Sequence, residues 1–182
     1  MDSRETARSR PWMAVGQEIA DLLGRIDPDA FARLVHVFDD PHRRWFFSGQ
    51  GRSGLAAQMA AMRFMHIGRS VHFVGEVSAP SIRAGDGLLI ISGSGMTPVS
   101  VGFAGIAKAE GATVATLTHK PAGQLASIAD TVLHVPVGST EQFGGSLFEQ
   151  ACLILLDSVI LDMARGLPDA HERMLHRHTN LQ

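Results

Sequence analysis

Two short loops carry the residues that could bind a charged ligand. Residues 49–54 read Gly-Gln-Gly-Arg-Ser-Gly, and residues 92–97 read Ser-Gly-Ser-Gly-Met-Thr. Each loop follows an apolar run and precedes a segment with helical spacing. Glycine lets backbone N–H groups come close to an anion, and the N-terminus of a helix attracts negative charge. The candidate binding residues in the two loops are Gly51, Arg52, Ser53, Ser92, Gly93, Ser94 and Thr97.

The first loop alone leaves the ligand open. Its spacing fits the Gly-x-Gly-x-x-Gly fingerprint of dinucleotide-binding folds, and Glu76 lies about where an acid would bind the ribose. A nicotinamide-dependent oxidoreductase is therefore one hypothesis. The second loop, and the lack of a second domain for a hydride donor or acceptor, favour a single phosphate group on a small polar molecule. Glycine turns that bind nothing, and serine caps on ordinary helices, are the structural alternatives.

The elements that must position these loops alternate between strands and helices. This alternation predicts βαβ units and a three-layer α/β/α sandwich with a five-stranded parallel sheet. The flavodoxin-like strand order 2-1-3-4-5 makes strands 1 and 3 neighbours, so that both loops face one crevice. The predicted strands are residues 44–48, 71–74, 87–92, 113–118 and 131–135, and the predicted helices are residues 53–67, 98–110, 123–129, 146–165 and 168–177. Two further helices are expected within residues 11–38.

Local signals mark individual helices. Asp27, which precedes a proline, is typical of an N-cap followed by a first-turn proline. Met59, Met62 and Met65 recur at helical spacing, and we interpret them as core packing. The helix over residues 146–165 is apolar nearly all round, which predicts that it is central or packs against another subunit.

Length and composition fit a soluble globular protein. The 182 residues are 45% hydrophobic and 19% charged, and the formal net charge is −2. This charge, together with the lack of a basic run, argues against nucleic-acid binding. The longest apolar stretch, residues 151–163, contains Asp157, Ser158 and Asp162 and is too short to span a membrane. The single cysteine, Cys152, is typical of a core residue in a reducing compartment, and no secretory signal is recognised, so a cytoplasmic location is expected.

We expect a single domain over residues 1–182. Its parts are a flexible N-terminus over residues 1–10, N-terminal helices over 11–40, an α/β core over 41–165, and a C-terminal helix and tail over 166–182. No internal repeat or linker divides the chain. The nine histidines include no His-x-x-x-His pair with a supporting acid, so no metal site is expected.

Several short segments resemble the sugar isomerase (SIS) domain family. They are Gly51-Arg52-Ser53-Gly54, residues 61–66 (Ala-Met-Arg-Phe-Met-His), Gly75-Glu76, residues 91–95 (Ile-Ser-Gly-Ser-Gly), residues 145–150 (Gly-Ser-Leu-Phe-Glu-Gln) and the tail residues 177–181 (Arg-His-Thr-Asn-Leu). The likeness runs from about Met13 to the end of the sequence. The two glycine–serine loops mark the family in general. The other long segments and the tail are similar to its 6-phospho-3-hexuloisomerase branch.

The resemblance implies a specific reaction. Enzymes of this branch interconvert D-arabino-hex-3-ulose 6-phosphate and D-fructose 6-phosphate through an enediol, without a metal or an organic cofactor. They form homo-oligomers, commonly tetramers, with active sites near subunit contacts, and a hexulose-phosphate synthase would be the functional partner. Met96 departs from the family, whose second loop usually carries an acidic residue there. A non-catalytic sugar-phosphate-binding module is therefore the alternative function.

Glu149 and His178 are the candidate catalytic residues. The resemblance makes Glu149 the base that moves a proton between C2 and C3 of the sugar. The segment from Ser146 to Glu149 also fits a capping box, in which the carboxylate would fold back on the helix start. His178 would donate a proton to a substrate oxygen or shuttle one. The structural alternative is that His178 is a solvated surface side chain, as histidines near a chain end usually are.

The other polar candidates keep a binding role and a structural alternative. Arg52 is expected to pair with phosphate or with a neighbouring carboxylate. Glu76 is expected to bind a sugar hydroxyl or to form a structural salt bridge, and His66 is interpreted as a packed side chain on a helix face. The hydroxyl groups expected to hold the phosphate or sugar oxygens belong to Ser53, Ser92, Ser94 and Thr97.

Overall fold

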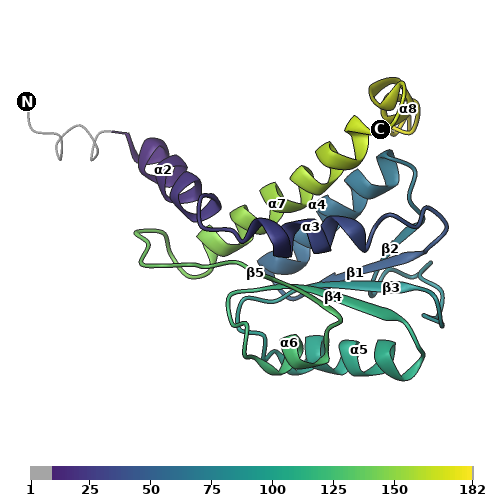
Figure 1. Ribbon diagram of the computed structural model, residues 1–182, viewed down its shortest axis with the longest axis horizontal. Coiled ribbons are helices and arrows are strands. Elements are labelled where there is room, and N and C mark those ends of the chain that lie inside the picture. The colour runs from purple at the N-terminus through teal and green to yellow at the C-terminus, as the bar shows by residue number, and fades with distance from the viewer. Residues whose placement is uncertain (1–9, 182) are drawn as a thin grey trace, which may run out of the picture.

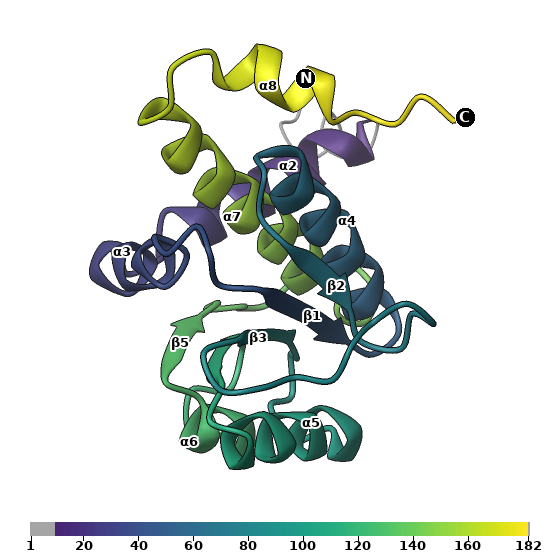
Figure 2. The same cartoon turned by 90° about the vertical axis from the view of Figure 1, so that its right-hand side faces the viewer.

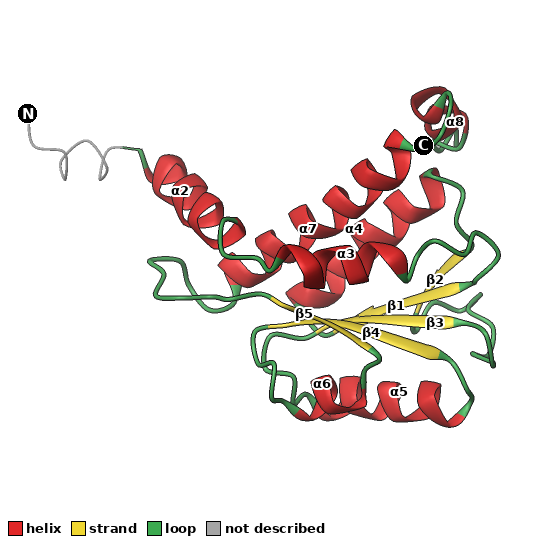
Figure 3. Ribbon diagram, in the orientation of Figure 1, coloured by secondary structure: helices red, strands yellow, loops and turns green. Residues whose placement is uncertain are grey.

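A computed structural model describes residues 10–181, and at its centre lies a parallel sheet of five strands. The strands are β1 (Trp45–Gly49), β2 (Val71–Phe73), β3 (Gly87–Ile91), β4 (Thr113–Thr118) and β5 (Thr131–His134). Their order across the sheet is β2-β1-β3-β4-β5, and every neighbouring pair runs parallel. The predicted fold class and strand order are therefore confirmed (Figure 3).

Helices cover both faces of the sheet (Figure 1, Figure 2). One face carries α5 (Pro98–Ala109) and α6 (Gln124–Ile128), and the other carries α3 (Pro28–His36), α4 (Arg52–His66) and α7 (Ser146–Arg165). Helix α2 (Pro11–Leu23) packs against α7 and extends beyond the sheet. Helix α8 (Ala170–His176) packs against α4 and α7 at the ends where these two helices finish.

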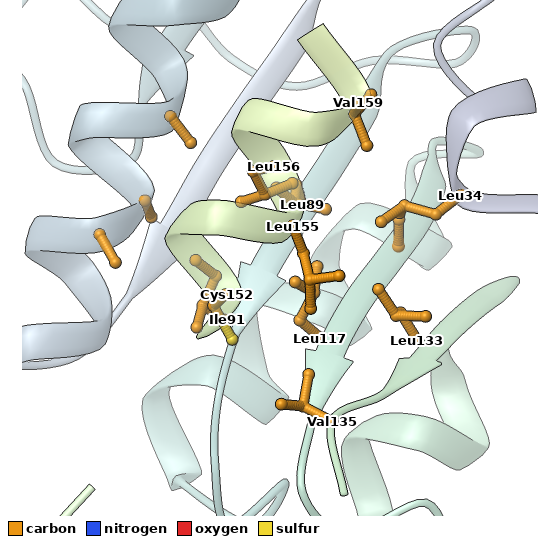
Figure 4. Packing of buried hydrophobic residues seen from close by; sticks show 14 of the residues in the cluster. Leu34, Leu89, Ile91, Leu117, Leu133, Val135, Cys152, Leu155, Leu156 and Val159 are labelled. Carbon is orange, nitrogen blue, oxygen red and sulfur yellow. The ribbon is translucent and has the colours of Figure 1, made fainter. Parts of the chain in front are cut away.

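The central strand β3 is buried along its whole length, and its side chains alternate between two cores. Leu89 and Ile91 belong to the core under α4 and α7, whereas Leu88 and Ile90 belong to the core under α5. Figure 4 shows the first pair beside side chains of α7, among them Cys152. Burial raises the pKa of the Cys152 thiol well above its ordinary value. The prediction that this cysteine is a core residue is confirmed.

Helix α4 corrects the interpretation of its methionines. Met59 and Met62 are 49% and 50% exposed, so they do not lie in the core of the chain. The buried face of α4 consists mainly of small residues, namely Ala56, Ala57, Ala60 and Ala61. Short side chains on that face let the helix lie close to the sheet and to α7. The spacing identified an apolar stripe correctly, but this stripe points away from the sheet.

Polar contacts fix the N-terminal helices. The side chain of Asp27 accepts a hydrogen bond of 2.9 Å from a backbone N–H in the first turn of α3, which confirms the predicted N-cap. Glu18 on α2 accepts hydrogen bonds from the Thr140 hydroxyl, the Glu141 backbone N–H and the Gln142 side-chain amide. These bonds, led by that of the Thr140 hydroxyl, lower the pKa of Glu18. They tie α2 to the loop that leads into α7.

The two ends of the chain were predicted less completely. The flexible segment expected over residues 1–10 lies, apart from Arg10, outside the described residues. Helix α8 begins two residues later than predicted, after Asp169, which adopts a left-handed φ of 55°. Between residues 10 and 181, no helix combines the length and the apolar character that crossing a membrane requires.

Candidate functional site

The strand order places the two glycine–serine loops at neighbouring positions on one edge of the sheet. Strands β1 and β3 are paired in register, with Ser48 opposite Ile90 and Gly49 opposite Ile91. Because both strands are parallel, the loops that follow them leave from the same edge. The prediction that these loops border one crevice therefore agrees with the observed topology.

The first loop turns so tightly that its glycines are required. A Cβ on Gly49 would lie 2.7 Å from the backbone of Ser53, and a Cβ on Gly54 would lie 2.7 Å from the carbonyl oxygen of Gly49. Gly51 has a φ of +56°, which other residues rarely adopt. Gly51 is also the N-cap of α4 and supplies no capping side chain, so the leading N–H groups of the helix keep their capacity to bind an anion.

The second loop gathers three hydroxyl groups around Thr97. The Thr97 hydroxyl lies 3.3 Å from that of Ser94 and 3.5 Å from that of Ser92. The Ser94 hydroxyl also accepts a hydrogen bond of 3.2 Å from the backbone N–H of Met96. Thr97 is the N-cap of α5, yet its side chain makes no capping bond. The alternative of serine caps on an ordinary helix therefore does not describe this loop.

Helix α7 begins against the second loop. A Cβ on Gly93 would lie 3.4 Å from the ring of Phe148, which is van der Waals contact, so the loop packs directly on the first turn of the helix. Phe148 is buried, and it precedes Glu149 in the first turn of α7. The packing of this ring brings the carboxylate of Glu149 to the same edge of the sheet as the two loops.

The carboxylate of Glu149 forms an ion pair with Arg52, the first residue of α4. The Glu149 side chain is 14% exposed and that of Arg52 is 63% exposed, so the carboxylate is sheltered while the guanidinium borders solvent. The N-cap of α7 is Gly145, and the Ser146 hydroxyl donates instead to the carbonyl oxygen of Phe143 at 2.9 Å. The capping-box interpretation is therefore wrong. The pairing of Arg52 with a neighbouring carboxylate agrees with one of the two predictions for this residue.

These groups suit proton abstraction beside a carbonyl group. A sheltered carboxylate can act as a general base. The Arg52 guanidinium can stabilise an oxyanion that develops next to it, and the hydroxyl-rich loop and two helix N-termini can hold a phosphate. Among the described residues, no group of three His, Cys, Asp or Glu side chains is arranged to hold a metal ion.

Glu76 lies apart from this ion pair. It follows β2, and its carboxylate lies 2.9 Å from Nδ1 of His72 on the same strand. Glu76 lines a cavity of about 510 Å³ together with Met62 and Met65 of α4, and no residue of the two loops lines that cavity. The contacts of Glu76 are those of the structural salt bridge that was one of its two interpretations.

His178 follows α8, the helix that packs at the end of α4 opposite to Arg52 (Figure 1). Its ring stacks on that of His66, with centroids 5.3 Å apart and planes 11° apart. The 15 residues of α4, from Arg52 to His66, correspond to about 20 Å along the helix. One chain therefore does not bring its own His178 to the carboxylate of Glu149. His66 is 3% exposed, and its predicted packed position is confirmed.

Sequence reasoning did not single out Lys120. It follows β4, the neighbour of β3, and its backbone N–H donates to the Thr118 hydroxyl at 3.1 Å. Lys120 lines a cavity of about 510 Å³ with Ser94 and Met96, which places a positive charge beside the second loop. The available signal was its position directly after a predicted strand. Met96 closes the other side of this cavity, where its sulfur accepts a hydrogen bond of 3.3 Å from the backbone N–H of Gln124.

Comparisons with known proteins show what this chain is similar to. The sequence matches the SIS domain family over residues 40–158. It is 39% identical over 176 residues to the 3-hexulose-6-phosphate isomerase of Mycobacterium gastri, an alignment that covers 92% of this chain and 88% of that protein. It is 38% identical over 146 residues to the 3-hexulose-6-phosphate isomerase of Bacillus subtilis (strain 168), covering 75% of this chain and 79% of that protein.

A similar fold occurs in a crystal structure of a hypothetical protein from Methanococcus jannaschii. The two structures superpose with a TM-score of 0.82 at 28% sequence identity, over 95% of this chain and 99% of that chain. A molecular function of 3-hexulose-6-phosphate isomerase has been inferred for that protein from its structure.

Proposed function

This chain belongs to the SIS domain family and is a sugar-phosphate isomerase, and we propose that it interconverts D-arabino-hex-3-ulose 6-phosphate and D-fructose 6-phosphate. The substrate follows from the relatives in Mycobacterium gastri and Bacillus subtilis, which are named for this reaction and align with most of the chain. The observation that carries the proposal is the ion pair of Glu149 with Arg52 beside the hydroxyl-rich second loop.

The phosphate group of the substrate binds at the second loop. The hydroxyls of Ser92, Ser94 and Thr97 lie within 3.5 Å of one another in two pairs, and the N-terminus of α5 follows directly. Lys120 borders the same loop and adds a positive charge for a dianionic group. A phosphate seated there leaves the sugar carbon chain to extend toward Glu149, since Gly93 packs on the residue before it.

Glu149 moves the proton that the reaction transfers between carbon atoms. In the direction of fructose 6-phosphate, its carboxylate takes the proton from C2 of the 3-hexulose, and the C2–H electron pair forms the C2=C3 bond of an enediolate. The negative charge develops on the oxygen at C3, where Arg52 can stabilise it. Glu149 then returns its proton to C3, while the hydroxyl proton on the C2 oxygen passes to the C3 oxygen. No atom is gained or lost.

His178 carries the proton between the two oxygens, and it comes from a second copy of the chain. Its own cleft is about 20 Å away along α4, so His178 can reach a Glu149 carboxylate only in another subunit. The exposed Leu55, Met59 and Met62 form an apolar stripe on α4 that begins beside the cleft and suits contact with such a subunit. The tetramer and the cytoplasmic location expected from the sequence, and a hexulose-phosphate synthase as the supplier of substrate, complete this proposal.

A coupled assay tests the reaction directly. The purified protein is given the 3-hexulose 6-phosphate, and formation of fructose 6-phosphate is followed through a coupled dehydrogenase. We expect turnover that is retained with a chelator present. Solvent deuterium should enter at C3 in the fraction of turnovers in which the Glu149 carboxyl exchanges its proton with water before returning it. Tight binding of the sugar phosphate without conversion would contradict the proposal. That outcome would instead support a sugar-phosphate-sensing module. The exposed Met96 favours this alternative, because the second loop of the family usually carries an acidic residue at this position.

A further inference from the structure

The stacked pair of His66 and His178 links a buried residue to the exposed tail. His66 is the last residue of α4 and is 3% exposed, whereas His178 follows α8 on the surface. The rings are nearly parallel, with 11° between their planes and 5.3 Å between their centroids. Such offset stacking is a favourable arrangement of flat rings and restricts the rotation of the exposed one.

Arg177 holds the same segment from the other side. Its Nη1 donates to the carbonyl oxygen of His66 at 3.4 Å and to that of Arg173 at 3.0 Å. The guanidinium also lies against Gly68, where an added Cβ would come within 3.0 Å of it. The residue before His178 is therefore anchored to the end of α4, and the tail begins from a defined position.

His66 offers an uncharged face to its partner. Burial lowers the pKa of His66, and the charges of Arg63 on the same helix and of His178 act in the same direction. Arg177 adds a further positive charge from α8. A neutral His66 adds no charge beneath the stacked ring, and the exposed His178 is the imidazole of the pair that is able to reach a substrate.

We propose that His66 is a positioning residue for the isomerisation, because its buried ring is the surface on which His178 is held in one orientation for the cleft of a second copy. This inference rests on the proposed role of His178. Holding a side chain in one rotamer before the reaction removes the ordering step from the barrier. The reaction itself uses only the exposed ring, so His66 acts through its partner and touches no substrate.

Four variants test this role in the full-length oligomer: His66→Leu, His66→Phe, His178→Ala and the double variant His66→Leu/His178→Ala. General acid–base groups contribute about 10²–10⁴-fold to a rate, so we expect about a 10²-fold lower kcat for His178→Ala. We expect His66→Leu to lower kcat by about tenfold or less with little change in KM, because the catalytic group is still present. His66→Phe keeps a flat ring and should retain kcat within about twofold.

The double variant separates positioning from general destabilisation. If His66 acts through His178, the leucine substitution causes no further loss in the His178→Ala background. An equal loss in both backgrounds, or the same loss for His66→Phe as for His66→Leu, would overturn the inference. Unchanged kcat in His178→Ala would instead overturn the proposed role of the tail histidine. Phe64→Leu is the matched control, since it removes a buried ring from the same turn and should lower the melting temperature without changing kcat well below it.

Discussion

At the N-terminal end of α4 the backbone positions the functional groups, whereas at the C-terminal end side chains do so. The first end follows β1 through a loop in which Gly49 and Gly54 approach the backbone too closely for any Cβ. The second end holds His178 by one stacked ring and by the hydrogen bond of Arg177 to a carbonyl oxygen. The loop that we propose for the anion is therefore fixed by the sheet, whereas the proposed proton donor follows a short helix at the surface.

The two ends of α4 therefore tolerate structural displacement to different degrees. A loop fixed by strand register has no adjustable part, because moving it means moving the sheet. The tail with His178 is held by one stacked ring, so it can shift to fit the surface of a neighbouring subunit. Within one chain the two ends are separated by the length of α4, so a site that uses both ends requires two copies of the chain.

The largest expected effect is at the first end. Glu149→Gln should lower kcat by about 10³-fold, because the amide cannot accept the C2 proton. The fold should persist, since the lost ion pair involves the largely exposed Arg52. Initial rates measure the loss of kcat, and the melting temperature measures whether the fold persists. Glu172→Gln, on the exposed face of α8, is the control and should change neither. Near-normal turnover of Glu149→Gln would show that another group is the base.

The second prediction asks whether the two ends meet between chains. Glu149→Gln and His178→Ala subunits are each poorly active, and they are mixed under conditions that allow subunits to exchange. Sites that pair an intact carboxylate from one chain with an intact histidine from the other should then restore activity, to about a quarter of the wild-type value for random pairing. Activity of the mixture that stays at the average of the two variants would place both groups in one chain.

The third prediction compares two glycines and measures how rigid the first end is. Gly49→Ala places a Cβ 2.7 Å from the Ser53 backbone, so we expect about 1–3 kcal/mol of destabilisation. Gly102→Ala is the control, because a Cβ in that part of α5 meets nothing within 4 Å. It should stabilise the fold by about 0.4–1 kcal/mol. Chemical denaturation measures both, and equal stability of the two variants would show that the first loop can relax.

The smallest expected effect is on the stability contributed by Glu18, which binds the loop that leads into α7. The pKa of Glu18 is lowered in the folded state, so its carboxylate stabilises the fold above the pKa of the unfolded chain. This contribution is lost as the pH falls through the folded-state pKa. We expect Glu18→Gln to lower the melting temperature slightly at neutral pH, with a difference that vanishes in acid. A difference that persists at low pH would show that the hydrogen bonds do not need the charge.

The sheet and its loops could be predicted because local patterns specify them. Alternating apolar strands and helices define the parallel sheet, and the two glycine–serine loops require neighbouring strands if they bind one ligand. The order β2-β1-β3-β4-β5 has this property. The packing of α4 could not be predicted in the same way. Both its alanine face and its Met59 stripe recur at helical spacing, and only the tertiary structure decides which one meets the sheet.

The sequence indicated the candidate site residues, but it did not indicate which partners their side chains contact. The Ser-x-x-Glu spacing that ends at Glu149 suggested a capping box, but the N-cap of the helix is Gly145 and the carboxylate reaches Arg52, 97 residues earlier. No local pattern contains such a long-range partner. The position of His178 was still harder to predict, because it depends on a stack with His66 that joins two segments distant in the sequence.

The pairing of Arg52 with Glu149 has a consequence for selectivity. The carboxylate is paired with a guanidinium, so a substrate must bring an acceptor for Arg52 before the carboxylate is available to take a proton. In the proposed reaction this acceptor is the oxygen at C3, on which negative charge develops beside Arg52. Under this proposal, a sugar that places no such oxygen next to Arg52 leaves the carboxylate paired.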